Sequence, residues 1–220
     1  HFIQVFRCAR KTGLVKEDTK LSFLGFGTMN GKDGKPFKTR EGGVMRLENL
    51  IADIDEEMFT KIVENRSVRD KDARDTAKIV GLAAIKYGDL SNQATKDYIF
   101  DVDRFTSFEG NTGPYILYTI VRIKSILNRY VEAGGNLEAG EILPASNGSE
   151  KNLMLQLSGF GSMIESAFEE KAPHKICAYI YEVSNAFNSF YHETKILSEE
   201  NQAQKESYIR LLQLTKRVLE

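Results

Sequence analysis

The chain has 220 residues, of which 30 are Lys or Arg and 31 are Asp or Glu, so its formal net charge is −1. This length is enough for one or two domains with a substantial hydrophobic core. The near-neutral charge excludes a general attraction to RNA, so binding of a nucleic acid would need a local basic patch. No apolar run approaches the ~20 residues of a membrane-spanning helix, and no signal peptide is visible.

The sequence contains two cysteines, Cys8 and Cys177, and three histidines. The cysteines lie far apart and match no metal-binding spacing, which predicts two reduced thiols in a cytoplasmic protein. We interpret the histidines as structural or helix-capping residues. We therefore expect this chain to bind no metal ion.

Segment 21–43 is a short apolar run followed by a basic loop that is punctuated by glycines. Four basic side chains lie close together in this loop: Lys32, Lys35, Lys38 and Arg40. They leave an excess of roughly three positive charges, and the glycines let the backbone approach an anion closely. The loop is interpreted as a polyphosphate-binding loop. The alternative is a solvated turn, since Lys-Asp-Gly-Lys runs are common in turns.

Two familiar phosphate-binding motifs do not fit this loop. A P-loop needs Gly-x-x-x-x-Gly-Lys-Ser/Thr, but Phe26 stands where the first glycine belongs and Asp33 where the hydroxyl residue belongs. A dinucleotide-binding fingerprint would need a glycine at Asn30. A phosphate-binding role therefore requires another kind of loop.

Beyond residue 28 strand-like alternation ends, and the pattern predicts helices almost throughout. Residues 47–90 carry apolar side chains at helical spacing among many charges. From residue 111 onward the pattern predicts a helix bundle, in which Asn111 or Thr112 can cap a helix with Pro114 in its first turn. The Gly-, Ser- and Asn-rich stretch 133–152 is interpreted as a linker between two bundle helices.

The helix after Pro114 has two distinct faces. One face carries an apolar stripe with the spacing i, i+4, i+7 and i+11: Ile116, Ile120, Ile123 and Leu127. A different face carries Tyr115, Tyr118 and Arg122 at i, i+3 and i+7. Two tyrosines and an arginine away from the core can stack on unpaired bases while the guanidinium meets a phosphate or a base edge. The alternative is that the tyrosines pack on a neighbouring helix and Arg122 pairs with a carboxylate.

Later helices are interpreted as scaffold. One apolar stripe predicts a core-facing helix: Leu153, Leu157, Phe160, Ile164 and Phe168. A second stripe lies between residues 176 and 191 and a third between residues 208 and 219. Tyr191 and His192 end the second of these helices.

Five further segments carry motifs that, read with the basic loop, resemble one known family: 84–93, 96–101, 108–115, 174–181 and 190–201. In this order and spacing the chain resembles the C-terminal half of a bacterial arginyl-tRNA synthetase, a class I enzyme. The resemblance implies a mainly α fold, with an anticodon-binding helix bundle preceded by a small remnant of an α/β Rossmann-type catalytic domain. The catalytic remnant would occupy residues 1–45, a helical connector residues 46–107, and the anticodon-binding bundle residues 108–220.

The resemblance also assigns roles within the basic loop. Residues 35–39 take the place of the family's Lys-Met-Ser-Lys-Ser loop, whose lysines stabilise the pyrophosphate leaving group when ATP activates the amino acid. Lys35 and Lys38 would then be catalytic, with ATP as substrate and Mg²⁺ as cofactor. Pro and Phe replace Met and Ser at the two positions between them, so the division of labour between the two lysines stays open. The surrounding ATP-binding positions would be Lys32, Gly34, Thr39 and Arg40.

On the RNA side, the resemblance places the helix after Pro114 near the anticodon stem and loop of tRNA. It implies tRNA contacts at four positions: Asn111, Tyr115, Tyr118 and Arg122. Direct contact at Tyr191 and His192 is a weaker expectation from the same resemblance.

The family attaches L-arginine to its tRNA with ATP, and we expect a monomeric parent protein with that activity. The family's His-x-Gly-His element has no counterpart in this sequence, so we expect the chain to be a piece of a longer protein and to be inactive alone, with no cofactor bound. One alternative is a non-catalytic helical protein-interaction module derived from a synthetase, against which the retained pair Lys35 and Lys38 argues. Another is an enzyme for a different nucleotide substrate, for which ATP binding by residues 1–45 would be the test.

Overall fold

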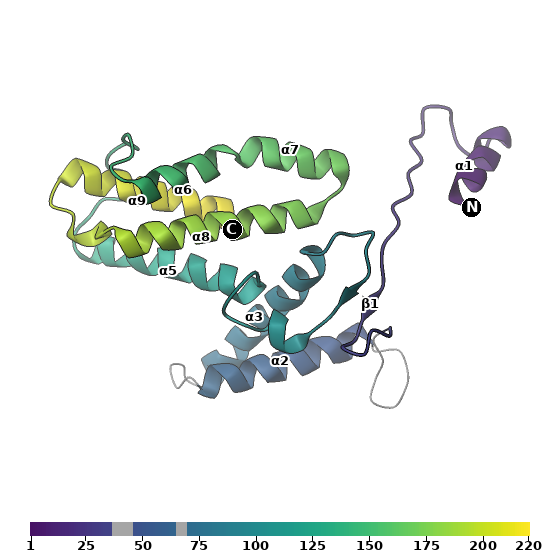
Figure 1. Ribbon diagram of the computed structural model, residues 1–220, viewed down its shortest axis with the longest axis horizontal. Coiled ribbons are helices and arrows are strands. Elements are labelled where there is room, and N and C mark those ends of the chain that lie inside the picture. Colours follow the sequence, from purple (N-terminus) through teal and green to yellow (C-terminus); the bar gives the residue numbers. More distant parts are fainter. Residues whose placement is uncertain (37–45, 65–69) are drawn as a thin grey trace.

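The computed structural model describes residues 1–36, 46–64 and 70–220, and these are mainly helical (Figure 1). The helices are α1 (Phe2–Lys11), α2 (Leu47–Glu64), α3 (Asp70–Leu90), α4 (Val102–Phe105), α5 (Gly113–Glu132), α6 (Gly148–Ser158), α7 (Phe160–Glu170), α8 (Pro173–Glu193), the 3-10 turn η1 (Ile196–Ser198) and α9 (Gln202–Leu219). Two short strands are β1 (Met29–Asn30) and β2 (Tyr98–Ile99). The predicted mainly α fold, a helix bundle preceded by a small α/β piece, is confirmed.

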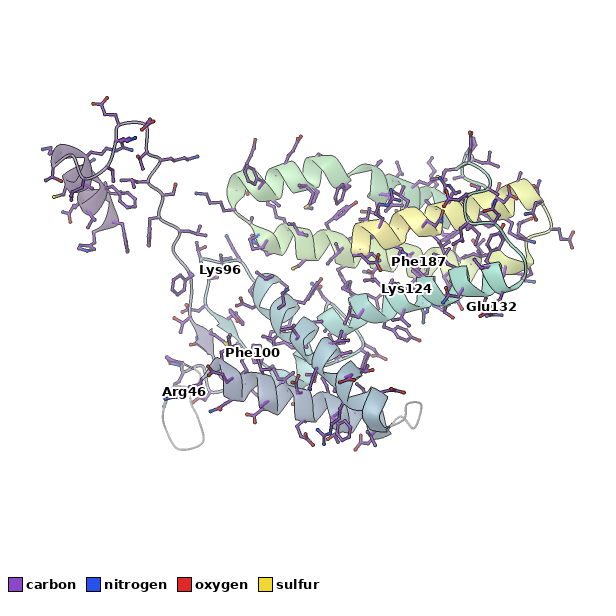
Figure 2. All side chains as sticks on the ribbon, turned by 180° about the vertical axis from the view of Figure 1, so that it is seen from behind. Arg46, Lys96, Phe100, Lys124, Glu132 and Phe187 are labelled. Atoms are coloured by element: carbon purple, nitrogen blue, oxygen red, sulfur yellow. The ribbon has the colours of Figure 1, made fainter. Side chains whose placement is uncertain are left out.

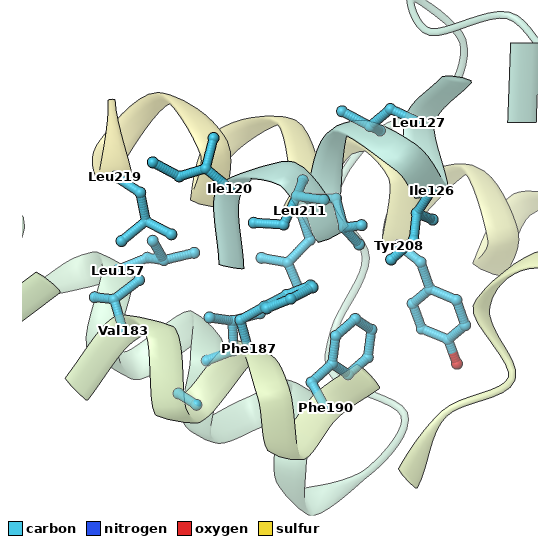
Figure 3. Close-up of a cluster of buried hydrophobic side chains, with 14 of the residues drawn as sticks. Ile120, Ile126, Leu127, Leu157, Val183, Phe187, Phe190, Tyr208, Leu211 and Leu219 are labelled. Carbon is cyan, nitrogen blue, oxygen red and sulfur yellow. The ribbon is translucent and has the colours of Figure 1, made fainter. Parts of the chain in front are cut away.

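Helices α5, α6, α8 and α9 pack around the larger hydrophobic core, shown in Figure 3. The predicted stripe of α5 is confirmed, because all four of its members are buried in this core: Ile116, Ile120, Ile123 and Leu127. Phe187 of α8 is fully buried among them. Burial of one side of α5 leaves its opposite side free to present polar and aromatic groups.

Helices α2 and α3 form a second, smaller core beside the bundle. Four apolar side chains of α2, each one turn from the next, are buried in it: Leu50, Ile54, Met58 and Ile62. Phe100 joins this smaller core, whereas Phe187 lies within the bundle (Figure 2). Tyr87 of α3 belongs to the larger core, so α3 packs into both.

The strands β1 and β2 pair in parallel, with Met29 opposite Tyr98. Just before β1, the backbone N–H of Gly27 donates to the carbonyl of Ala94 at 2.8 Å. A Cβ atom at Gly27 would lie 2.2 Å from the Lys96 carbonyl oxygen, so the two backbones approach as closely as only glycine permits. The sequence pattern did not predict β2, because a two-residue strand is too short for alternation to appear.

Helix α1 lies apart from the other helices and is joined to β1 by an extended segment (Figure 1). None of its residues is buried. Phe2 stacks on Phe23 of the extended segment with ring centroids 4.1 Å apart, while Leu14 and Phe26 are exposed. The first part of the chain thus presents apolar side chains to its surroundings.

The predicted stripe from Leu153 to Phe168 is only half correct. The chain breaks at Gly159 into α6 and α7. Leu153 and Leu157 of α6 are buried, but Phe168 of α7 is 82% exposed. The reason is that α7 packs against α8 and the end of α6, beyond the reach of the other bundle helices.

The connection between α5 and α6 is shorter than the predicted linker, since α6 takes up the end of stretch 133–152. Asn147 caps α6, with its Oδ1 accepting the backbone N–H of Glu150 at 2.8 Å. The buried carboxylate of Glu150 in turn accepts the backbone N–H of Ser146 at 2.6 Å. These bonds fix the point where the connection enters α6. Within the described ranges, no helix is long and apolar enough to cross a membrane.

Candidate functional site

A hollow of about 540 Å³ opens between the start of α5 and the end of α8. The loop before α5 and these two helices line it: Phe108, Glu109, Tyr115, Tyr118, Arg122, Asn188 and His192. The structure therefore brings together three of the four tRNA contacts expected from the sequence. It adds four side chains from elsewhere in the chain.

Helix geometry explains why these side chains meet. On α5, Tyr115, Tyr118 and Arg122 lie at i, i+3 and i+7, which places them on one face beside the buried stripe. On α8, Asn188 and His192 are one turn apart. Because the apolar faces of α5 and α8 share one core, their adjoining polar faces converge at its edge.

The Arg122 guanidinium is held by neutral groups. Its Nη1 donates to Asn188 Oδ1 at 2.5 Å, and its Nη2 donates to the Tyr118 hydroxyl at 3.2 Å. Its Cζ lies 4.8 Å from the ring centroid of Tyr118 and 5.1 Å from that of Tyr191. In the part of the chain that the structure describes, Arg122 forms no ion pair with a carboxylate, so the alternative in which Arg122 pairs with a carboxylate is wrong there.

Tyr115 is held against α8. Its hydroxyl donates to Asn185 Oδ1 and accepts from Asn188 Nδ2, both at 2.8 Å. Its ring meets Tyr181 edge to face at 5.7 Å, and burial raises the pKa of its hydroxyl. Tyr115 thus packs on the neighbouring helix, as the alternative interpretation held, whereas Tyr118 is 49% exposed.

Asn111 lies outside the lining of the hollow. Its side-chain oxygen accepts a hydrogen bond from the Tyr87 hydroxyl of α3. Thr112, the other candidate cap, begins α5, since its Oγ1 accepts the backbone N–H of Tyr115 at 3.2 Å. Asn111 is therefore part of the junction between α3 and the loop before α5.

The sequence analysis did not assign Phe108, Glu109 or Asn188 to the site. A signal for α8 exists: Asn185, Asn188 and His192 interrupt an apolar helix at i, i+3 and i+7, the same spacing as the polar face of α5. Two helices with matched polar stripes beside apolar ones can be expected to meet along both. The loop residues carry no such periodic signal.

The described part of the basic loop is a tight hairpin. The backbone N–H of Gly31 donates to the Lys35 carbonyl at 2.8 Å, and Gly34 turns the chain with a φ of 71°. Lys35 is exposed, and within the described residues its side chain makes no hydrogen bond or ion pair. Lys38, Thr39 and Arg40 lie outside the described residues.

Lys32 is in a different situation from Lys35. Its Nζ lies 3.0 Å from Asp101 Oδ1 and 2.8 Å from Asp103 Oδ2. The hydrogen bond from Lys32 holds the pKa of Asp103 below its usual value and raises the pKa of Lys32. Asp103 therefore loses its charge at a lower pH than an unpaired aspartate does, and the ion pair with Lys32 is lost as the pH falls through that lowered pKa. Lys32 fastens the hairpin to the segment after β2.

Two family models match this chain. Residues 1–102 match the catalytic domain of class I tRNA synthetases (R), and residues 116–220 match the DALR anticodon binding domain. The first match contains the basic loop, and the second contains Tyr118, Arg122 and Asn188. The described residues contain no group of three or more His, Cys, Asp or Glu that could hold a metal ion.

Curated relatives of this chain are arginine–tRNA ligases. The protein of Agathobacter rectalis is 68% identical over 228 residues, which cover 100% of this chain and 38% of the relative. That of Alkaliphilus oremlandii is 57% identical over 220 residues, which cover 100% of this chain and 37% of the relative. The chain thus spans less than half the length of the curated relatives that it matches.

Solved structures with the same fold are also arginyl-tRNA synthetases. The enzyme from Plasmodium falciparum superposes with a TM-score of 0.79 at 26% identity, covering 100% of this chain and 36% of that one. The enzyme from Thermus thermophilus superposes with a TM-score of 0.76 at 23% identity, covering 89% of this chain and 32% of that one, a likeness of fold alone. The chain therefore matches arginyl-tRNA synthetases along its length, with a class I catalytic-domain piece followed by a DALR domain.

Proposed function

We propose that this chain, a homologue of the arginyl-tRNA synthetases over its whole length, binds the anticodon arm of an arginine-accepting tRNA in the hollow between α5 and α8. Unpaired bases would stack on Tyr118, and the Arg122 guanidinium would meet a phosphate or a base edge. Because the net charge is near zero, this local arrangement has to supply the attraction. We keep the boundaries 1–45, 46–107 and 108–220 as the proposed division of the chain.

One observation carries this proposal, the state of Arg122. A buried or half-buried arginine that serves packing is expected to be paired with a carboxylate. Here neutral groups and two aromatic rings fix the guanidinium, and Glu109 is the acidic side chain in the lining of the hollow. Among the described residues Arg122 has no ion-pair partner, and a positive charge held in place in this way is suited to receive an anion.

For the whole protein we propose the attachment of L-arginine to tRNA with ATP, in the cytoplasm and as a monomer. Lys35 and Lys38 would offset the negative charge that develops on the leaving pyrophosphate, acting electrostatically and not as nucleophiles. Lys35 is exposed, and among the described residues its side chain has no partner, which supports a role toward an incoming anion. The whole protein would use ATP with Mg²⁺, and we propose no ligand for the metal ion among the described residues.

The binding proposal is tested with the 220-residue chain and a transcript of arginine-accepting tRNA, measured by fluorescence anisotropy across a salt series. Tyr118→Ala or Arg122→Ala is expected to weaken binding by ~1 to 3 kcal/mol, because each removes a stacking or anion-binding group. The matched control is Arg217→Ala, which removes an exposed arginine of α9 outside the hollow.

The same transcript with its anticodon bases changed completes the test. Weaker binding of the altered tRNA, with an effect that disappears in Arg122→Ala, would support base-dependent recognition in the hollow. The proposal would be contradicted if correctly folded Tyr118→Ala and Arg122→Ala bound both transcripts as tightly as the unaltered chain does. The chain would then be better described as a protein-interaction module.

A second prediction concerns the basic loop in a full-length synthetase that contains this chain. Lys38→Ala is expected to slow adenylate formation by about 10²- to 10³-fold, the usual effect of removing one positioned electrostatic group, while arginine binding changes little. Lys32→Ala is expected to have a smaller effect, since two aspartates already hold Lys32 Nζ. Pyrophosphate exchange measures the rate of adenylate formation in both variants. An undiminished rate in Lys38→Ala would show that Lys38 is not part of the site.

A further inference from the structure

We infer that Asn188 is a positioning residue of the hollow, whose side-chain amide fixes the Arg122 guanidinium without neutralising it. The inference rests on the proposed function, because it concerns how the same hollow recognises RNA. It gives Asn188 of α8, which was not among the expected tRNA contacts, a part in RNA recognition. The geometry and the charge of the amide support it separately.

The geometry of the amide is determined by its neighbours. The Tyr115 hydroxyl has one proton and donates it to Asn185 Oδ1 at 2.8 Å. It must therefore accept from Asn188, which it does from Nδ2 at 2.8 Å. Asn188 Oδ1 is consequently turned toward Arg122, and it accepts from Nη1 at 2.5 Å.

A second set of contacts fixes the orientation of Arg122. The Tyr118 hydroxyl accepts from Nη2 at 3.2 Å, and the rings of Tyr118 and Tyr191 lie within 5.1 Å of Cζ. An arginine has rotatable side-chain bonds, so a guanidinium without these contacts would sample many directions. Asn188 supplies the shortest of them and comes from a different helix, which ties the guanidinium to the frame of the bundle.

The charge of the amide is the second argument. An aspartate at this position could hold Arg122 equally well, but the resulting ion pair would offset the positive charge offered to RNA. A neutral amide oxygen positions the group and leaves its charge available. Among the residues that line the hollow, α8 contributes Asn188 and His192, and the acidic side chain there is Glu109 of the loop before α5. Glu182 lies further along α8 and is not part of the lining.

The experiment compares four variants of the chain by binding to the arginine-accepting tRNA transcript across a salt series. Asn188→Asp is expected to weaken binding at low salt and to reduce the slope of log K against log salt by about 0.7, the value for one lost contact to a single-stranded phosphate. Arg122→Gln is expected to reduce the slope by the same amount. Asn188→Ala is expected to weaken binding about tenfold, because a charge-assisted hydrogen bond is lost.

Asn185→Ala is the matched comparison, since it removes an asparagine of the same helix that bonds Tyr115 but not Arg122. We expect less than a threefold change in affinity and an unchanged slope. Thermal unfolding followed by circular dichroism establishes that each variant is folded. If Asn188→Ala does not fold, Asn188→Asp carries the test, because it keeps the size of the side chain and a bond to Arg122.

The outcomes separate this inference from the proposed function. If Arg122→Gln binds tRNA as the unaltered chain does, the proposed function fails and the inference with it. If Arg122→Gln weakens binding but Asn188→Asp keeps the full affinity and slope, the inference is overturned and the proposed function stands. An equal loss in Asn185→Ala and Asn188→Ala would likewise overturn it, because a general loosening of the helix would then explain both.

Discussion

Lys32 and Arg122 show two opposite environments for a positive charge in one chain. Two carboxylates hold Lys32 Nζ, whereas an amide, a hydroxyl and two aromatic rings hold the guanidinium of Arg122. A count of charges along the sequence treats both as available cations. Their neighbours distinguish them: Lys32 stabilises the position of a hairpin through ion pairs, whereas the charge of Arg122 is available to bind an anion.

The two thiols give a prediction at the scale of single residues. Cys8 is exposed, whereas burial raises the pKa of the Cys177 thiol to about 11. At pH 8 the folded chain should therefore react with a chromogenic disulfide reagent rapidly at one thiol, since the thiolate is the reactive form. The second thiol should react at a comparable rate only after unfolding, or as the pH rises toward 11.

The control is Cys8→Ser, which should remove the rapid phase and leave the slow one. Two rapid equivalents in the folded chain at pH 8 would mean that Cys177 is accessible, contrary to its place in the larger core.

At the scale of helices, the periodicity of the sequence predicted which faces are buried, but not how the helices break or pair. The buried stripe of α5 and its polar face were predictable, because a spacing near 3.6 residues specifies the faces of one helix. The stripe of α5 alone does not identify the partner of that face, and the signal for it is the matched spacing of Asn185, Asn188 and His192 on α8. Gly159 divides the stripe from Leu153 to Phe168 into α6 and α7. The spacing of apolar residues continues across Gly159, so the periodicity does not reveal this break.

The contact between α3 and α5 yields a prediction about packing. A Cβ atom at Gly113 would lie 2.3 Å from the Ala83 carbonyl oxygen, so the start of α5 touches the backbone of α3. Gly113→Ala should therefore lower the free energy of unfolding by about 1 to 3 kcal/mol, the usual cost of overpacking. Urea denaturation followed by far-ultraviolet circular dichroism measures this change.

Gly161→Ala is the matched control, since a Cβ atom there meets nothing within 4 Å and the residue lies inside α7. This substitution should be neutral or stabilise the chain by up to ~1 kcal/mol, because alanine favours a helix more than glycine does. Equal changes in the free energy of unfolding for the two substitutions would show that the close contact with α3 does not make Gly113 necessary.

For the whole molecule, the junction between the two cores depends on α3. The Tyr87 hydroxyl lies within hydrogen-bonding distance of Asn111 Oδ1 and of the Cys177 carbonyl, the latter at 2.7 Å. Burial raises the pKa of Tyr87, so the hydroxyl stays protonated and able to donate through the neutral range. One side chain thus connects α3, the loop before α5 and α8.

Tyr87→Phe should lower the free energy of unfolding by about 1 to 2 kcal/mol, because it removes a buried hydrogen bond and keeps the ring. It should also weaken tRNA binding less than Arg122→Ala does, since Tyr87 does not line the hollow. Denaturant unfolding and the tRNA titration measure the two effects. A loss of binding as large as that of Arg122→Ala would show that this junction controls the hollow.

The sequence predicted the broad architecture well, because long periodic helices and family-like motifs run along the whole chain. It named four of the seven lining residues of the hollow, three that share a face of α5 and, as a weaker expectation, His192. The other three, Phe108, Glu109 and Asn188, come from a loop and from α8, and tertiary packing brings them to the α5 face. The parallel pairing of β1 with β2 is likewise a long-range contact that no local pattern contains.

That pairing has a consequence for the order in which the chain assembles. The backbone N–H of Thr28 and its acceptor Asp97 Oδ1 are 69 residues apart in sequence, and α2 and α3 lie between them. Each helix forms from local contacts, whereas this pairing must first close a long loop and gains only a few hydrogen bonds in return. The pairing is therefore expected to wait until α2 and α3 have packed together and shortened the distance. The hairpin that carries Lys35 would then be among the last parts to reach its place.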